Sequence, residues 1–369
     1  MNTKARPILR HTEPKSGLAF FVFFIFLFVA TLFSATGCRN SHQPQPPQQS
    51  KKVVSISGKT MGTTYSILVV SDTESSVTKK LQSLVDKRLE AINQKMSSYV
   101  VTSEISRFSH TEDTSWQDVS SETLEVLEEA QKISRQSDGT FDVTVGPLVN
   151  LWNFGPGAKE TFTPPDQIVI SKALTNIGFE KLELNLEKGQ IRKSRPALKV
   201  NLSAIAKGYA VDQIGDLLIE HNYPNFMVEI GGEILTHGQK PGKKDWVIGV
   251  QNPGVSSGSD LMKVNLSGLA VATSGGYNNY FEYKGQKYSH TINPKDGWPV
   301  THRLDSVTVF AESCMRADGL ATALMVMGEK VGLAFAEEEK IAAIFLFTDA
   351  EGKKKVEFSS SVKTVLLKE

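Results

Sequence analysis

An aspartate and a threonine stand four residues apart in the stretch 314–328, CMRADGLATALMVMG. Residues at this spacing share one face of a helix, so Asp318 and Thr322 would aim a carboxylate and a hydroxyl in the same direction. A hard divalent cation prefers oxygen ligands of this kind. An aspartate near a helix start also commonly caps that helix, so the pair alone leaves both interpretations open.

A second polar group opens the predicted helix of residues 202–222, in NLSAIAKGYAVD. Asn201 or Ser203 would cap this helix, which would start near Ser203. The N–H groups of its first turn could bind a phosphate, and Lys207 could pair with the same anion. The alternative is an ordinary capped helix with Lys207 in solvent.

Two further stretches offer chemistry or a binding surface. His290 ends a predicted strand in GQKYSHTINPKDGWP, beside a tight turn at 293–297. A histidine held there could act as acid or base, although a lone histidine is more often structural. The apolar and aromatic stretch 137–156, SDGTFDVTVGPLVNLWNFGP, could be core or a wall on which a flat ring stacks.

These groups must be positioned by a chain that mixes hairpins with helices. Apolar spacing predicts helices at 76–99, 120–139, 166–178 and 202–222, besides the one that follows the strand at 306–314. Alternation and turn residues predict hairpins at 53–70, 181–194 and 340–360, strands at 225–238 and 245–253, and strand pairs at 261–275 and 280–294. This order favours an α+β fold with mixed, largely antiparallel sheets packed with helices over a doubly wound parallel sheet.

Composition and missing fingerprints exclude several classes of protein. Among the 369 residues, 40% are hydrophobic and 22% are charged, which is typical of a packed globular body. The net charge of +1 provides no basic field for nucleic acid. No GxGxxG opens a strand-to-helix turn and no Walker loop occurs, so the usual nucleotide-binding motifs are missing.

Residues 1–38 are typical of an export signal. Four basic residues precede an apolar run at 18–34, and ATGC follows, ending at Cys38. The run is short for a stable membrane span. The ending resembles a lipoprotein signal, in which Cys38 is lipidated and becomes the mature N-terminus; an uncleaved anchor and plain secretion are the alternatives.

The rest of the chain divides into a linker and one domain. Residues 39–52 are polar and rich in Pro and Gln, which predicts a flexible tether, and the folded domain should cover 53–369. If Cys38 carries lipid, Cys314 has no partner for a disulfide within the chain. Its apolar neighbours predict a buried, inert thiol.

Several short stretches, taken in order, are specific where each alone would be weak. They are GKTMGTTYSI, SSY, DGTFDVTVGPLVNLWNFGP, NLSAIAKGYAVD, VEIGGEI, ATSGGYNNYF, YSHTINPKDGWPV, SVTVFAESCMRADGLATALMVMG and the closing hairpin. In this order they resemble the ApbE family, the FAD:protein FMN transferases. The resemblance runs from about Val53 to the end of the chain.

The resemblance implies an activity, a location and partners. The protein would cleave FAD with a divalent metal, Mg²⁺ or alternatively Mn²⁺, release AMP, and transfer FMN through a phosphoester to a Thr or Ser of an exported acceptor protein. The acceptor would carry an Asp-Gly-x-Ser/Thr-Gly-Ala-Thr/Ser type motif, as in subunits of respiratory or electron-transport complexes. The enzyme would be lipid-anchored to a bacterial membrane, facing the periplasm or the outside. An FAD pyrophosphatase giving FMN and AMP, and a non-catalytic FAD-binding lipoprotein, are the alternatives.

The resemblance also implies roles for individual residues. The predicted metal ligands are Ala204, Asp318, Ala321 and Thr322, with the Ala204 oxygen joining from the other helix. His290 is the candidate for activating the acceptor hydroxyl or for stabilising the leaving AMP, and Asp318 would share that work through the metal. The predicted FAD contacts are Met61, Tyr99, Thr140, Phe141, Asp142, Asn201, Lys207 and Ile292.

Three positions depart from the family pattern. Asn201 stands where an aspartate often occurs, Lys207 where some members have glutamate, and Ala321 where some carry aspartate. With fewer carboxylates, the cation should bind more weakly without FAD, whose phosphates could complete its coordination shell.

Overall fold

The computed structural model describes residues 51–72, 75–251, 260–276 and 279–366. All of them belong to one compact unit, Gln49–Glu369. The predicted export signal, including Cys38, and most of the predicted tether lie outside the described residues.

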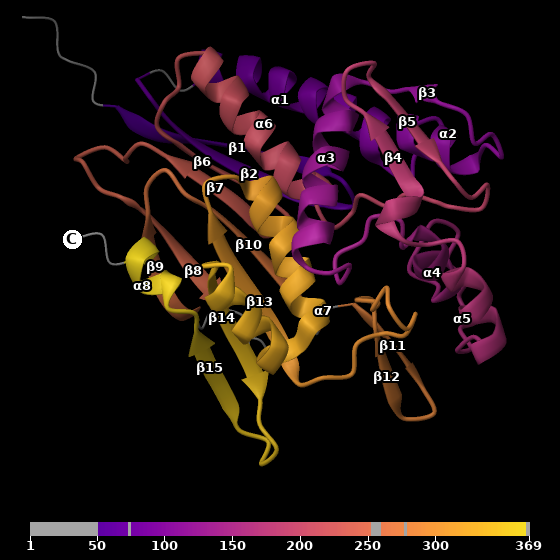
Figure 1. Cartoon of the computed structure of the whole chain (residues 1–369). Helices are drawn as coiled ribbons and strands as arrows, with labels where there is room; N and C mark the ends of the chain where they lie inside the picture. The colour runs from indigo at the N-terminus through magenta and orange to yellow at the C-terminus, as the bar shows by residue number, and fades with distance from the viewer. Residues whose placement is uncertain (1–50, 73–74, 252–259, 277–278, 367–369) are drawn as a thin grey trace, which may run out of the picture. The chain divides into compact units, whose positions relative to one another are not determined.

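An eight-stranded sheet forms the centre of this unit, and its neighbouring strands are antiparallel (Figure 1). The strands, in spatial order, are β1 (Lys52–Thr60), β2 (Thr63–Ser71), β6 (Phe226–Ile230), β7 (Glu233–His237), β10 (Ala270–Gly275), β13 (Leu304–Ala311), β14 (Ala342–Thr348) and β15 (Lys354–Phe358). The predicted α+β class with largely antiparallel sheets is therefore confirmed.

The hairpin predicted at 53–70 is β1 and β2. Its turn consists of Met61 (φ 49°) and Gly62 (φ 74°), so both central residues have positive φ. This is the arrangement of a type I′ turn, whose twist matches that of the flanking strands. The pairing runs without a break from Lys52 opposite Ser71 to Thr60 opposite Thr63.

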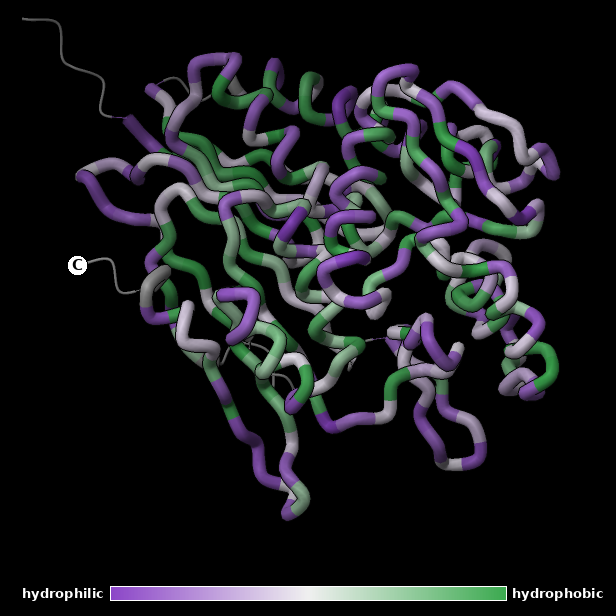
Figure 2. Tube along the Cα trace, in the orientation of Figure 1, coloured by the Kyte–Doolittle hydropathy of each residue, from purple (hydrophilic) through white to green (hydrophobic). Residues whose placement is uncertain are grey.

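Helices cover one face of the sheet (Figure 1). Helix α1 (Ser75–Met96) packs on β1, α6 (Ala206–Glu220) on β6 and β7, and α7 (Cys314–Glu338) on β10 and β13, while α3 (Ser121–Gln136) packs against α7. The predicted apolar face of α1 is confirmed, since Leu81, Val85, Leu89 and Ile92 are buried in this layer. Figure 2 shows hydrophobic residues concentrated in the central strands and in α7.

Helix α7 is long and apolar enough to cross a membrane by composition, with a mean hydropathy of 1.4 over its best window. In the fold it is instead a core helix, packed against α6 and the sheet. Its path changes at Gly328 (φ 78°, ψ 177°), which separates two helical segments. His302 Nε2 donates to the carbonyl oxygen of Met325 at 2.7 Å, next to this break.

The other face of the sheet is covered by the hairpin of β8 (Trp246–Gln251) and β9 (Asp260–Leu266), with α8 (Ser361–Leu366) beside it. The predicted pairing within 261–275 is wrong, because β9 pairs with β8 and β10 pairs with β7 and β13. The link at 267–269 carries the chain between two layers. Val264 and Leu266 then pack against Val271 of the sheet face beneath them.

Two groups of smaller elements complete the unit. A three-stranded sheet is formed by β3 (Gln117–Asp118), β4 (Leu182–Asn185) and β5 (Gln190–Lys193), next to α2 (Glu104–His110) and the 3₁₀ turn Phe179–Lys181. Helices α4 (Gly146–Leu151) and α5 (Gln167–Leu174) pack with the hairpin of β11 (Tyr280–Tyr283) and β12 (Gln286–Ser289). The predicted hairpins at 181–194, 280–294 and 340–360 are confirmed by these strands and by β14–β15.

An aromatic cluster holds that last group of elements together. Trp152 is fully buried, with its ring centroid 5.6 Å from that of Tyr288 and 5.2 Å from that of Trp298. Its Nε1 donates to the Gly297 carbonyl at 2.7 Å. The stretch 137–156 is therefore core at Trp152, whereas Phe141 and Phe154 reach the cavity wall.

Candidate active site

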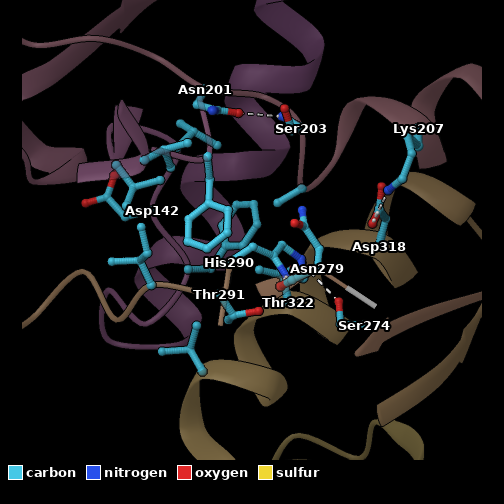
Figure 3. A pocket seen from close by; sticks show the side chains of 18 of the residues that line it. Asp142, Asn201, Ser203, Lys207, Ser274, Asn279, His290, Thr291, Asp318 and Thr322 are labelled. Atoms are coloured by element: carbon cyan, nitrogen blue, oxygen red, sulfur yellow. Dashed lines mark hydrogen bonds and ion pairs between the residues drawn. The ribbon is translucent and has the colours of Figure 1, made fainter. Parts of the chain in front are cut away.

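A cavity of about 420 Å³ opens where the first turn of α6 and the N-terminal half of α7 meet the end of β10 and the residues after β12 (Figure 3). This volume lies within the range of small-molecule sites. The cavity brings together most residues predicted from sequence: Tyr99, Thr140, Phe141, Asp142, Asn201, Ala204, Lys207, His290, Ile292, Asp318 and Thr322.

Two predicted residues do not line the cavity among the described positions. Met61 lies in the β1–β2 turn, where it is partly buried against the main core. Ala321 is fully buried inside α7 and could offer a cation only its backbone oxygen. Their predicted roles in flavin contact and metal binding stay predictions.

Each of the helices α6 and α7 provides a carboxylate that accepts N–H groups from the first turn of the other helix. Asp318 of α7 accepts the backbone N–H of Gly208 in α6 at 3.0 Å. Asp212 of α6 accepts the N–H groups of Cys314 and Met315 in α7 at 2.8 and 2.9 Å. A carboxylate at a helix N-terminus is favoured by the helix dipole, so each helix stabilises the start of the other.

The same crossing requires glycine at position 208. A Cβ there would lie 2.6 Å from the Cys314 carbonyl carbon and 2.7 Å from the Met315 Cα, which are both backbone atoms. Gly208 therefore sets how closely the two helices approach, and with it the distance between the groups they present to the cavity.

The capping differs from the prediction at both helices. Helix α6 begins at Ala206, one turn later than expected, and Asn201 Oδ1 accepts the N–H of Ser203 at 2.9 Å without capping the helix. In α7 the cap is Ser313, whose side chain accepts the Arg316 N–H, so Asp318 does not cap its own helix. In the first turn of α6 the Gly208 N–H already donates to Asp318, so this N–H is not available for the predicted phosphate binding.

The Ala204 carbonyl oxygen is a candidate cation ligand. In a continuous helix the Gly208 N–H would donate to the oxygen four residues earlier, that of Ala204. Here this N–H donates to Asp318 Oδ2. The Ala204 oxygen thus lacks its helical donor, and Ala204 lines the cavity beside Asp318.

A lysine and two carboxylates form the most charged part of the cavity. Lys207 Nζ lies 3.2 Å from Glu233 Oε1 and 3.5 Å from Asp318 Oδ1. Burial by itself would lower the pKa of Lys207, but the charges of Asp318 and Glu233 outweigh it and raise this pKa. Burial, together with the Asp318 charge, raises the pKa of Glu233, and Lys207 opposes that rise. The ammonium therefore stays charged inside the cavity.

The oxygen groups around Asp318 suit a hard cation. Thr322 Oγ1 lies on the same helix face as Asp318 and is 3.2 Å from Ser274 Oγ, and Figure 3 shows the dashed line that joins Thr322 and Ser274. A carboxylate, a hydroxyl and a backbone carbonyl are the donors that Mg²⁺ and Mn²⁺ use. The described residues contain no cluster of three or more His, Cys, Asp or Glu that could hold a metal, so such a cation would need oxygens from a ligand as well.

His290 is held as a neutral base. Its Nδ1 lies 3.0 Å from the carbonyl oxygen of Asn279, which can only accept, so Nδ1 carries the proton and Nε2 is left with its lone pair. Burial lowers the pKa of His290, and the Lys207 charge lowers it further, whereas the bond to Asn279 opposes them. At neutral pH this arrangement favours the neutral ring, with the proton on Nδ1.

Another part of the wall is apolar and nearly closed to solvent. Phe141 is 2% exposed and Asp142 is 7% exposed. Thr144 donates its N–H and its hydroxyl to Asp142 Oδ1, both at 2.7 Å, yet burial still raises the pKa of Asp142. At the rim, Tyr99 is 58% exposed and its hydroxyl donates to the Phe154 carbonyl at 2.9 Å. Such a wall suits a flat aromatic ligand with a few polar edges.

The sequence model of the ApbE family matches residues 61–345, and this range contains every element that lines the cavity. The chain belongs to the ApbE family.

Named members of the ApbE family resemble the chain over most of its length. The FAD:protein FMN transferase of Vibrio cholerae serotype O1 is 41% identical over 341 residues, which are 92% of this chain and 98% of that protein. The solved Flavin Transferase ApbE from Vibrio cholerae has a TM-score of 0.78 and 40% identity, covering 86% of this chain and all of that one. The flavinyl transferase ApbE of Pseudomonas stutzeri, in its apo form, also has a TM-score of 0.78, with 35% identity over 86% of this chain and 98% of its own.

Four residues of this ApbE-family site had no role in the sequence-based prediction. Glu233 pairs with Lys207, Ser274 with Thr322, Asn279 with His290, and Asp212 with the start of α7. All except Asn279 and Ser274 come from motifs where a charged residue stands out, VEIGGEI and KGYAVD. Their partners lie between 11 and 102 residues away in the chain, so no local spacing signals these pairs.

Proposed function

We propose that the chain is an FAD:protein FMN transferase, which moves FMN from FAD to the hydroxyl of a threonine or serine in an acceptor protein and releases AMP. The observation that carries the proposal is the meeting, in one cavity, of Asp318, Thr322 and the Ala204 carbonyl with the neutral ring of His290. The relatives named FAD:protein FMN transferase support the substrate and the reaction.

The reaction needs a base, an electrophile and a leaving group. The acceptor hydroxyl oxygen forms a bond to the FMN phosphorus of FAD, and the bond between that phosphorus and the bridging oxygen breaks. The bridging oxygen leaves with its electron pair as part of AMP. His290 Nε2 is free to take the proton of the hydroxyl, because Nδ1–H is bonded to Asn279.

The residues of the site fit a divalent cation, Mg²⁺ or alternatively Mn²⁺. Asp318, Thr322 and the carbonyl oxygen of Ala204 would hold it, and the phosphates of FAD would supply further oxygens. When bound, such a cation neutralises charge on phosphoryl oxygens and favours attack at phosphorus. Asp318 keeps its orientation through the Gly208 N–H, which also ties the metal site to α6.

The two ends of FAD need different surroundings. The apolar wall with Phe141 suits the flavin ring, and the rim with Tyr99 leaves a path for an acceptor segment from solvent. The positive charge of Lys207 suits the diphosphate. All of the predicted FAD contacts except Met61 line this one cavity, which supports the proposal.

The location and the acceptor are parts of the same proposal. The export signal that ends at Cys38 supports a lipid anchor on a bacterial membrane, with the domain facing the periplasm or the outside. The acceptor would be an exported protein with the Asp-Gly-x-Ser/Thr-Gly-Ala-Thr/Ser type motif. Labelling cells with a tagged fatty acid tests the anchor. The unchanged protein should carry the label and Cys38→Ser should not, and an unlabelled unchanged protein rules the lipid anchor out.

Intact-mass spectrometry of an acceptor domain with that motif tests the activity. The domain would be incubated with FAD, Mg²⁺ and the protein lacking residues 1–38, beside an Asp318→Ala variant. A mass gain of one FMN less water, absent with EDTA and in the variant, is expected. Free FMN and AMP with an unmodified acceptor would instead indicate the pyrophosphatase, and FAD binding without AMP release would indicate a binding protein.

A further inference from the structure

The Lys207 ammonium lies between two carboxylates that are each 3% exposed. Its Nζ is 3.2 Å from Glu233 Oε1 and 3.5 Å from Asp318 Oδ1. Asp318 is the only carboxylate among the predicted metal ligands, and Glu233 has no role in the proposed reaction. The positive charge of Lys207 therefore stands beside the group to which a divalent cation would bind.

One carboxylate oxygen of Glu233 is an unused hydrogen-bond acceptor among the described residues. Its Oε2 is buried, and no hydrogen-bond partner for it is found among the described residues. Glu233 also begins β7, paired with Ile230 across the turn at 231–232, so the sheet fixes its position. A buried carboxylate needs a counter-charge, and Lys207 is the cation within reach.

We propose that Lys207 is an internal cation that competes with the divalent metal for Asp318, and that Glu233 keeps the ammonium when the metal binds. The inference rests on the metal of the proposed function and deepens it. Two positive charges a few ångströms apart in a buried site repel strongly, so Lys207 weakens metal binding to the free protein.

The competition links the metal to FAD. The negative diphosphate of FAD would offset the charge of Lys207, so a metal that binds weakly alone binds more tightly with FAD present. Coupling of this kind is reciprocal, and the metal would strengthen FAD binding by the same factor. Lys207 thus favours loading of the site by metal and FAD together.

The test measures Mn²⁺ binding in the absence of FAD, by electron paramagnetic resonance of free Mn²⁺, on the full chain in detergent. Lys207→Met should bind Mn²⁺ at least about tenfold more tightly than the unchanged protein, because the competing charge is gone. Lys207→Arg, which keeps the charge, should bind Mn²⁺ as the unchanged protein does. Glu233→Gln should bind it at least about threefold more weakly, since the ammonium then has only Asp318 as a charged partner.

One further variant separates this inference from the metal site on which it rests. Asp318→Asn should lose Mn²⁺ binding in every background, because the carboxylate is the predicted ligand. If Asp318→Asn loses binding while Lys207→Met binds no more tightly than the unchanged protein, the competition is refuted and the metal site of the proposed function stands. If Asp318→Asn keeps full binding, the metal lies elsewhere and both fail.

The double variant Lys207→Met with Glu233→Gln tests the part played by Glu233. If Glu233 acts through Lys207, its substitution should have a smaller effect on Mn²⁺ affinity when Lys207 is already methionine. An equal loss in both backgrounds would make Glu233 a direct ligand and overturn its role as the ammonium's partner. Thermal unfolding of each variant shows whether it is folded.

Discussion

Replacing Gly208 with alanine should damage the active site more than the stability of the fold. The new Cβ would lie 2.6 Å from the Cys314 carbonyl carbon and 2.7 Å from the Met315 Cα. Ordinary contact needs at least 3.4 Å, so α6 and α7 must separate by almost 1 Å. Because both neighbours are backbone atoms, no side chain can rotate away to relieve the contact.

The separation has two consequences of different size. Overpacking costs about 1–3 kcal/mol, and alanine in a helix returns about 1 kcal/mol relative to glycine, so the net loss in the free energy of unfolding is about 0–2 kcal/mol. At about 2–4 °C per kcal/mol, Tm should fall by no more than about 8 °C. A 1 Å displacement of groups in an active site can cost about 10²-fold in rate. The Gly208 N–H bond to Asp318 is the first contact that this movement would break.

The assay is the initial rate of FMN transfer to an acceptor domain at saturating Mg²⁺, with Tm from circular dichroism. Gly215→Ala is the matched control, because it lies in the same helix and its Cβ would meet Leu235 Cδ2, the end of a flexible side chain. The control should keep most of its rate. If Gly208→Ala transfers FMN as fast as the control does, the close crossing of the helices is not what positions Asp318.

Three further predictions concern single side chains. Burial lowers the pKa of His290, so if its neutral ring is the base, kcat/KM should fall only as the pH drops below 6.5. This decline in kcat/KM should be absent in His290→Ala. A decline that begins above pH 6.5 in the unchanged protein contradicts the assignment. Thr322→Val should raise the Mg²⁺ concentration needed for half-maximal transfer, whereas Thr322→Ser, which keeps the hydroxyl beside Ser274, should not. If both variants need the same Mg²⁺ concentration, Thr322 is not part of the metal site. Trp152→Phe should lower the free energy of unfolding by about 1–3 kcal/mol in a urea titration, because it leaves the buried Gly297 carbonyl without its donor. Trp298→Phe should lower it less, because the hydrogen bond that it removes, to Gln167, is exposed.

Local chemistry made the strands and hairpins predictable. The β1–β2 turn was marked by Gly62, which tolerates positive φ and stood between two alternating runs, whereas the positive φ of Met61 was not predictable. The end of α3 was likewise marked by Gly139, whose N–H reaches back to the Ser134 carbonyl at 2.8 Å. Cys314 was predicted to be a buried thiol, and it is fully buried, with a pKa that burial raises well above its usual value.

Partners distant in sequence were not predictable in the same way. Nothing in β9 itself distinguishes β8 from β10 as its neighbour, because both carry the alternating apolar residues that pair equally well. Asp318 looked like a cap for α7, since apolar spacing became regular only at Leu320. The helix in fact starts earlier, at the cap provided by Ser313, and the Asp318 carboxylate serves α6 instead.

The predicted site residues were gathered largely as expected because the family motifs mark loops and helix starts that face one cavity. Which opposite charges would pair with one another was harder to predict from the sequence. Whether Lys207 points to solvent, to phosphate or to Glu233 depends on the distance between α6 and β7, and that distance follows from packing rather than from the motif.

The exchange of carboxylates between α6 and α7 also bears on the order in which the chain acquires its structure. Asp318 and Gly208 are 110 residues apart, and Asp212 is 102 and 103 residues from Cys314 and Met315. Neither segment can bring the Ala204 oxygen and the Asp318 carboxylate together alone, so the site exists only once the two segments have docked. A chain that is still folding therefore carries no half-built site that could trap a metal ion or a nucleotide. The ability to bind these ligands would report that α6 and α7 have docked.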